Sequence, residues 1–316
     1  MKKKGLFSQY SSFEKRDFPF IYLLIAFPVI QFAIFWFYAN MSSIGLAFTN
    51  ISGSFSFTNF KTVFDAFTSA DMYGINLGKS LLRSLILWLV GECICFPISI
   101  ITTYVLAKKV RGHYILRICY IIPSLIGSII WTALVKFLVS YDGGVTMLLV
   151  KIGINLPRTA LKFGLLGDAA TAFPTLVTVR FIMGIVGNNV VMTGAFSRVP
   201  NELFESARLD GAGFWTECFR IAIPCIGSTL STLITFALCS IFTCDYNVYL
   251  YTNGTGQPEV STIGFQIFHL TYRLSQGTSD NYGYPAALGL TLTMMTLPVV
   301  LIGRRVVEKI FDAVEV

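Results

Sequence analysis

Two ionisable side chains lie inside long apolar runs of this 316-residue sequence, and they are the residues best placed for chemistry. Glu92 falls in the run from about Ser84 to Ala107, and Arg180 in the run from Phe173 to about Phe196. A charge at the centre of a bilayer costs about 2.5–3.5 kcal/mol on insertion scales, so each needs a partner or water. Both lie about eight residues from the same end of their runs, so we expect them at similar depth, facing the interior and able to pair. Such a pair either contacts a solute in a pathway or only fixes the packing of two helices.

A second, weaker set of candidates combines hydrogen-bonding groups with aromatic rings near the ends of these runs. Sugars are bound by planar hydrogen-bonding groups together with aromatic faces, and this set supplies both. The alternative is an ordinary aromatic belt at the membrane interface. The set consists of Asn188, Asn189, Met192, Asp245, Tyr246, Asn247 and Tyr249.

Other candidate motifs in the sequence do not have the residue spacing that their chemistry requires. The segment Gly74–Ser80 mimics a phosphate-binding loop, but three residues rather than four separate its glycines, and it runs directly into an apolar segment. The seven cysteines form no C-x-x-C pair, which disfavours a disulfide framework or a zinc site. We therefore expect no catalytic residue, no metal site and no cofactor in this chain.

The composition predicts an all-α polytopic membrane protein. Apolar residues make up 54% of the chain and charged residues 13%, and the mean hydropathy is +0.67. A membrane span needs about 20 apolar residues, and residues 40–80 are expected to form an aqueous loop. Another loop, of about 30 residues, follows the third span. The six predicted spans are Phe18–Phe37, about Ser84–Ala107, about Ile115–Phe137, Phe173 to about Phe196, Cys225–Cys244 and Ala286–Ile302.

The basic residues predict the orientation. If the N-terminus is cytoplasmic, fifteen of the 24 Lys and Arg residues lie in cytoplasmic segments, seven lie in opposite segments and two lie in spans. The positive-inside rule therefore favours cytoplasmic N- and C-termini. The net charge of +7 does not indicate nucleic-acid binding, because the basic residues flank apolar spans.

The stretch 199–224 is the segment around which the chain is organised. Pro200 and Asn201 are suited to a helix start, with Asn201 as the cap, and Leu203, Phe204 and Ala207 recur on one apolar stripe. Gly211 and Gly213 then break the helix, Phe214–Ile221 can form a second short helix, and Pro224 opens the next span. The stretch would either fill the groove of a partner or lie on the lipid surface.

Its residues resemble the EAA loop of ABC importer permeases. Glu205-Ser206-Ala207, Gly211 four positions later, and Ile221-Ala222-Ile223-Pro224 keep every spacing of that motif, with Ser206 and Ile223 as conservative departures. The flanks Pro200–Leu203 and Leu209–Ala212 resemble the carbohydrate branch, of the maltose and glycerol-phosphate type. The likeness covers most of residues 80–305.

This resemblance implies a type I ABC importer permease fold with six transmembrane helices in a bacterial plasma membrane. Residues 1–79 would hold a tail, the first helix and an external loop, 80–305 the permease core, and 306–316 a cytoplasmic tail. The residues implied in coupling to an ATPase are Leu203, Phe204, Glu205, Ala207, Asp210 and Gly211. Among them, Glu205 would make a charged contact, Leu203 and Phe204 would form the apolar anchor, and Gly211 would allow a bend that a Cβ would obstruct.

The implied function is transport of a saccharide, without enzymatic activity of this chain. The implied partners are a second permease, two ATPase subunits that carry ATP and magnesium, an extracytoplasmic solute-binding protein and membrane lipid, with no nucleic acid. Gly211→Asp or Glu205→Lys is expected to abolish transport and coupling but not insertion. The alternatives are a permease for peptides or phosphate, and an ion-driven secondary transporter, which would need midplane ionisable groups or inverted repeats.

Overall fold

The structure, a computed structural model, describes residues 12–50, 52–69, 76–108, 110, 112–187, 189–244, 246–253, 258–276 and 281–312. The described residues form α-helices and three π-helical segments, and their β-structure is one isolated bridge between Thr49 and Phe55. The predicted all-α class is confirmed. The elements are α1 Ser12–Gln31, η1 Phe32–Tyr38, α2 Ala39–Ala47, α3 Thr58–Thr68, α4 Leu77–Leu89, η2 Val90–Cys95, α5 Phe96–Ala107, α6 His113–Leu125, α7 Ser128–Leu138, α8 Gly144–Lys151, α9 Arg158–Phe163, α10 Ala169–Gly184, α11 Asn189–Phe196, α12 Asn201–Leu209, α13 Phe214–Glu217, η3 Cys218–Ala222, α14 Ile223–Cys225, α15 Gly227–Cys239, α16 Val248–Tyr251, α17 Ile263–Ser275 and α18 Gly283–Asp312.

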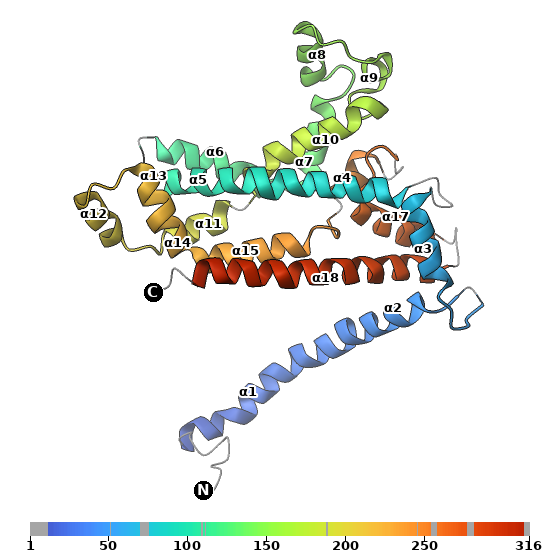
Figure 1. Ribbon diagram of the computed structural model, residues 1–316, viewed down its shortest axis with the longest axis horizontal. Helices are drawn as coiled ribbons and strands as arrows, with labels where there is room; N and C mark the ends of the chain where they lie inside the picture. Colours follow the sequence, from blue (N-terminus) through green and yellow to red (C-terminus); the bar gives the residue numbers. More distant parts are fainter. Residues whose placement is uncertain are drawn as a thin grey trace.

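The helices α4, α5, α15 and α18 run roughly parallel in an elongated bundle, and the helix from α1 to α2 runs obliquely beside them (Figure 1). Four helices of the described chain are long and apolar enough to cross a membrane, namely Phe20–Ala47, Leu77–Ala107, Ala169–Phe196 and Gly283–Phe311. Two bent pairs raise the number to six if each pair is one span. Six spans agree with the number predicted from hydropathy.

The two bent pairs differ from the sequence prediction, one because it is broken at all and the other in the position of its break. The predicted third span is broken between His113–Pro123 and Ser128–Leu138, which meet at 95°. Pro123 lies inside α6, and Gly127 adopts an extended conformation between the two helices. The predicted start of the fifth span at Pro224 is also wrong, because Pro224 lies in the last turn of the preceding helix and the 75° bend comes before Gly227.

The outer segments contain more helix than predicted. The first helix continues to Ala47, and residues 58–68 form α3, although residues 40–80 are predicted to be an aqueous loop. The buried side chain of Asn59 fastens α3 by donating to the carbonyl oxygens of Ala47 at 3.2 Å and Thr49 at 2.8 Å. The segment after the third predicted span likewise contains α8 and α9, which project from the bundle (Figure 1). These short helices were missed because hydropathy detects lengths that cross a membrane, and not short amphipathic turns.

Three groups of buried side chains hold the bundle together. One joins α2, α3, α4, α17 and α18 at one end, and another joins α7, α9, α10 and α16. The third, which we call the inner cluster, contains Phe96, Tyr104, Ala195, Cys218 and Leu230 among its buried members. The inner cluster lies at the end of the bundle that carries α12, where α1 begins and α18 ends (Figure 1).

Candidate functional site

The first candidate region is α12 and the turn that follows it. Pro200 takes the N-cap position and no side chain caps the helix, so the prediction of Asn201 as the cap is wrong. At the other end, Gly211 has φ +77°, and Gly211 N–H and Ala212 N–H donate to the carbonyls of Arg208 at 3.1 Å and Ala207 at 2.9 Å. This pair of bonds is a Schellman motif, which closes a helix at a left-handed residue. The chain reverses here because the backbone is left-handed at Gly211.

The bend at Gly211 does not depend on space. A methyl group at Gly211 would have no heavy atom of the surrounding chain within 4 Å, so a Cβ there would be obstructed by the local backbone at positive φ and not by packing. A left-handed conformation costs an ordinary L-residue about 1–2 kcal/mol, and asparagine tolerates it better. We therefore expect Gly211→Asn to keep most of the transport activity and Gly211→Val to lose most of it. Uptake assays on both variants, at matched amounts in the membrane, test this order, and equal losses would show that φ is not the constraint.

The two faces of α12 differ from the sequence prediction. Ala207 is buried and Phe204 packs against the inner cluster, so both point toward the bundle. Ala207 is thus turned away from a partner in this conformation, whereas Phe204 is half-buried and lines a cavity, so its part in the ATPase contact stays a prediction. The side chains of Leu203 and Leu209 are 42% and 89% exposed, respectively. The exposed residues of α12 and its C-cap are Asn201, Glu202, Leu203, Glu205, Ser206, Arg208, Leu209 and Asp210, and Arg208 among them is already in an ion pair.

Leu209 is the functional candidate that sequence reasoning missed on α12. Glu202, Glu205, Ser206 and Leu209 follow the spacing i, i+3, i+4, i+7, which places them on one face of a helix. A single exposed leucine is ordinary at a protein surface, and Leu209 is a candidate because it is 89% exposed on the same helix face as Glu205. The signal was present in the sequence, although the stripe through Leu203, Phe204 and Ala207 drew attention to the opposite face.

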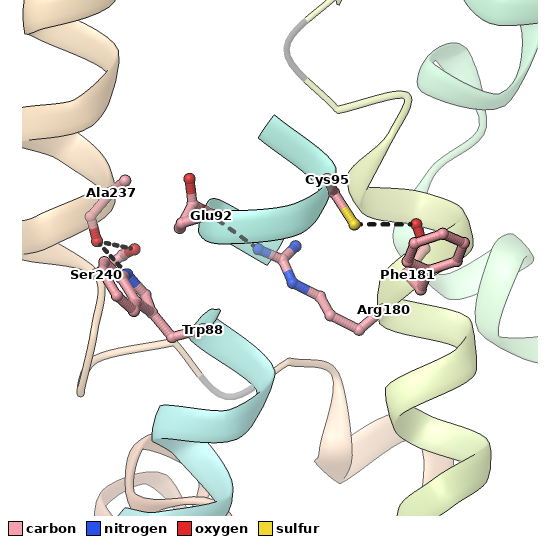
Figure 2. Close-up of polar contacts among 7 residues, drawn as sticks. All are labelled: Trp88, Glu92, Cys95, Arg180, Phe181, Ala237 and Ser240. Atoms are coloured by element: carbon pink, nitrogen blue, oxygen red, sulfur yellow. Dashed lines mark hydrogen bonds and ion pairs between the residues drawn. The ribbon is translucent and has the colours of Figure 1, made fainter. Parts of the chain in front are cut away.

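The second candidate region is the predicted pair inside the bundle, which the structure confirms. Arg180 Nη2 on α10 donates to Glu92 Oε1 in η2 at 3.2 Å (Figure 2). Their side chains keep 27% and 19% of their exposure. Sequence reasoning missed Gly91, where a methyl group would overlap the guanidinium of Arg180. Gly91 thus lets the guanidinium lie directly against the backbone of the neighbouring helix.

Neighbouring contacts fix the helices that carry this pair. Cys95 Sγ lies 3.3 Å from the carbonyl oxygen of Phe181, and Trp88 Nε1 donates to Ala237 O at 2.8 Å (Figure 2). The start of α10 is fixed by Asp168, whose carboxylate accepts from the backbone N–H of Ala170 at 3.0 Å. The Thr159 hydroxyl and the first N–H groups of α10 together hold the pKa of Asp168 below its ordinary value.

A cavity of about 290 Å³ lies beside Arg180. Its size is close to the lower limit of about 300 Å³ for small-molecule sites. Arg180 Nε is buried without a hydrogen-bond partner among the described residues, so the guanidinium keeps donors that Glu92 does not use. The ring of Tyr246 lies 5.3 Å from Arg180 Cζ. Other residues that line the cavity are Trp131, Val179, Met183, Asn247 and Tyr251.

The remaining weak candidates differ in where the structure places them. Asn247, in a left-handed conformation, lines this cavity together with Tyr246. Tyr249 instead packs edge-on against Phe268, with ring centroids 4.9 Å apart. Asn188 and Asp245 lie outside the described residues.

Asn189 and Met192 pack α11 onto α5 rather than face a pathway. Asn189 is buried, and its Oδ1 accepts from the hydroxyls of Ser99 at 2.7 Å and Thr103 at 2.9 Å. Met192 is fully buried in the inner cluster. The prediction of Asn189 as a pathway residue is therefore wrong for this conformation, because its amide oxygen is already occupied. An asparagine inside an apolar run does not by itself reveal whether it faces a neighbouring helix or a cavity.

Several known transport proteins are similar in sequence to this chain. The diacetylchitobiose uptake system permease protein NgcF of Streptomyces coelicolor is 29% identical over 201 residues, which cover 60% of this chain and 52% of that protein. The multiple sugar-binding transport system permease protein MsmF of Streptococcus mutans is 22% identical over 268 residues, which cover 84% and 87%. The maltose/maltodextrin permease protein MalF of Shigella flexneri is 24% identical over 216 residues, which cover 65% of this chain and 40% of that protein.

Solved structures share the fold. A chain of a bacterial ABC transporter that imports the acidic polysaccharide alginate superposes with a TM-score of 0.71 at 23% identity, over 94% of this chain and 97% of the other. The same kind of transporter, in complex with an alginate pentasaccharide-bound periplasmic protein, gives 0.72 at 24% identity, over 94% and 96%. Finally, the model of one protein family matches residues 95–314. This range includes the whole of α12 and the turn at Gly211 that closes it. The chain therefore belongs to the family of binding-protein-dependent transport system inner membrane components.

Proposed function

We propose that this chain is a permease subunit of an ATP-driven carbohydrate importer and forms half of its translocation pathway. The observation that carries the proposal is the short helix α12, closed by the left-handed Gly211 and exposing Leu203, Glu205 and Leu209 at one end of the bundle. An amphipathic helix of this kind fits the groove of a partner. The names of the sugar permeases NgcF, MsmF and MalF support carbohydrate as the class of cargo.

The proposed partners follow from this function. An ATPase dimer would bind α12 and would carry ATP and magnesium, while a second permease would complete the pathway. A solute-binding protein would deliver the saccharide on the opposite side, as supported by the periplasmic protein bound to the alginate transporter. We place the protein in a bacterial plasma membrane with both termini cytoplasmic, because α12, the start of α1 and the end of α18 share one end of the bundle (Figure 1).

The cavity beside Arg180 is the proposed contact with the saccharide. Donors of a guanidinium and an aromatic ring offer both of the groups that saccharide recognition uses. The charge of Arg180 is balanced by Glu92, so the pair as a whole carries no net charge. We therefore expect the cavity to bind a saccharide mainly through hydrogen bonds and not through attraction of a charged group.

The proposal is tested by purifying the tagged permease from its native membrane and reconstituting the complex in liposomes. We expect ATPase subunits to co-purify, and ATP hydrolysis to rise when the solute-binding protein is added with its saccharide. A panel of neutral and uronate oligosaccharides, with a peptide and phosphate as comparisons, identifies the cargo. Uptake that a proton or sodium gradient drives without ATPase subunits would overturn the proposal, and stimulation by peptide or phosphate alone would overturn the assignment to carbohydrate.

A further inference from the structure

The position of α12 depends on few contacts. A cavity of about 480 Å³ separates much of α12 from the end of α5 and the start of α6, and its lining includes Tyr104, His113 and Phe204. On the bundle side, α12 contributes Phe204 and Ala207 to apolar packing. A helix that is not packed solidly against its support can shift unless a specific contact holds it. The charged residues around this cavity provide such a contact.

Glu217, the last residue of α13, is the centre of that contact. Its side chain is 2% exposed, and its Oε2 accepts from Lys108 Nζ at 2.6 Å. Its Oε1 lies 3.5 Å from Arg208 Nη2, which belongs to α12. One buried carboxylate therefore joins three segments, namely α12, α13 and the end of α5.

Two aromatic rings keep Lys108 in place. Lys108 Nζ lies 5.2 Å from the centre of the Tyr104 ring and 5.0 Å from the centre of the Phe214 ring. Both distances are within the range of cation–π attraction, about 6 Å. A cation that is held by two rings and a carboxylate has little freedom to leave. Removing one member of such a buried pair is costly because the remaining charge stays in a poorly hydrated site.

Lys108 follows directly after the span Leu77–Ala107, and this span also contains Glu92. A displacement of α12 would reach this span through Arg208, Glu217 and Lys108. The span in turn contacts α10 through the Glu92–Arg180 pair beside the cavity of about 290 Å³. A continuous chain of contacts thus connects the exposed helix with the interior of the bundle.

We propose that Glu217 is a positioning residue that links α12 to the span Leu77–Ala107, so that ATPase movement reaches the translocation pathway. This proposal rests on the proposed function as an importer subunit. Glu217 touches neither the ATPase nor the saccharide, and it acts by keeping Arg208 and Lys108 in register. The quantity that it controls is the ratio of transport to ATP hydrolysis.

The test compares Glu217→Gln with Glu308→Gln in the reconstituted complex. Glu308 makes an exposed ion pair with Arg304 at 2.6 Å on α18, so its variant removes a pair of equal length that joins no separate segments. We expect Glu217→Gln to lower the stimulation of ATP hydrolysis by loaded solute-binding protein by about fivefold or more, and to lower the saccharide moved per ATP. Glu308→Gln should match the unmodified protein, and equal behaviour of the two variants would overturn the proposal.

A double-mutant cycle shows whether the effect passes through Lys108. We expect Lys108→Gln to resemble Glu217→Gln, and the double variant to lose no more than either single variant. Fully additive losses would overturn the proposed link.

If Glu217→Gln fails to assemble with the ATPase, the variant Arg208→Gln tests the proposal instead. The Arg208 side chain is 59% exposed, and this variant removes only the link to α12. Transport per ATP equal to that of Glu308→Gln would then reject the proposal.

The outcome for the unmodified complex separates the two proposals. If the unmodified permease co-purifies with no ATPase, or shows no stimulated hydrolysis, the proposed function fails. If the unmodified complex is coupled and the Glu217 variants remain coupled to the same degree, only the role of Glu217 fails.

Discussion

Arg180→Ala is expected to reduce the amount of folded permease in the membrane and its thermal stability in detergent. The substitution removes the counter-charge of Glu92. It also removes the guanidinium that packs directly against the backbone at Gly91. Breaking a buried ion pair costs about 3–5 kcal/mol. The side chains of Arg180 and Glu92 keep 27% and 19% of their exposure, so we expect about 3 kcal/mol or less. Thermal unfolding followed by size-exclusion chromatography measures this loss.

The double variant Arg180→Ala, Glu92→Gln separates packing from contact with the saccharide. It removes both charges, so stability should return toward that of the unmodified protein. If the pair only fixes helix packing, transport should return with stability. Because Arg180 lines the cavity that we propose as the contact with the saccharide, we expect stability to recover while transport stays low. Full recovery of uptake would show that Arg180 makes no contact that transport needs.

Glu205→Lys and Leu209→Ser are expected to abolish coupled transport without affecting insertion. Both residues are exposed on α12, and Leu209 is the most exposed large apolar side chain on that helix. A central contact residue in an interface contributes about 2 kcal/mol or more to binding, which corresponds to about 30-fold in affinity. ATPase co-purification and stimulated hydrolysis should therefore fall together in both variants.

Glu308→Lys provides the matched control for this prediction. It reverses a charge at an exposed glutamate of α18, outside the surface proposed to bind the ATPase. We expect normal co-purification for Glu308→Lys. A permease with Glu205→Lys and Leu209→Ser together that still recovers the ATPase at the normal level would show that α12 is not the contact.

The sequence predicted the helix at α12 and its end at Gly211 because both depend on local chemistry. Glycine is the residue that adopts a positive φ without strain, and the pattern of apolar residues predicts a helix wherever it occurs. The direction of each face was harder to predict. Leu203, Phe204 and Ala207 form one stripe, and only the tertiary structure shows that Phe204 and Ala207 turn inward while Leu203 remains partly exposed.

Glu217 could not be found from its sequence neighbours. A single glutamate in a short helix that links two apolar segments is normally exposed to solvent. One of its partners, Lys108, lies 109 positions away and belongs to another helix. The pair of Glu92 and Arg180 was predictable despite a separation of 88 positions, because each charge is unusual within an apolar run. A charged residue within an apolar run is rare, so both partners could be identified from the sequence although they lie far apart along the chain.

The bend in the third span was missed for a related reason, whereas the break before the fifth span was predicted and only its position was wrong. Hydropathy averages over a window of residues and gives the same value for a straight helix and for two helices that meet at 95°. Pro123 and Gly127 together indicate a possible break, although prolines also occur inside continuous membrane helices, as Pro298 does in α18.

The first long helix has a mechanical consequence of its own. From Phe20 to Ala47 it contains 28 residues, and none of the side chains in its apolar window is buried. At about 1.5 Å per residue it is about 42 Å long, whereas the hydrocarbon core of a bilayer is about 30 Å thick. The whole bilayer with its headgroup regions is about 40–45 Å thick, so the helix can cross upright with Asn40, Ser42 and Ser43 at headgroup level. In a thinner bilayer the same helix should lean.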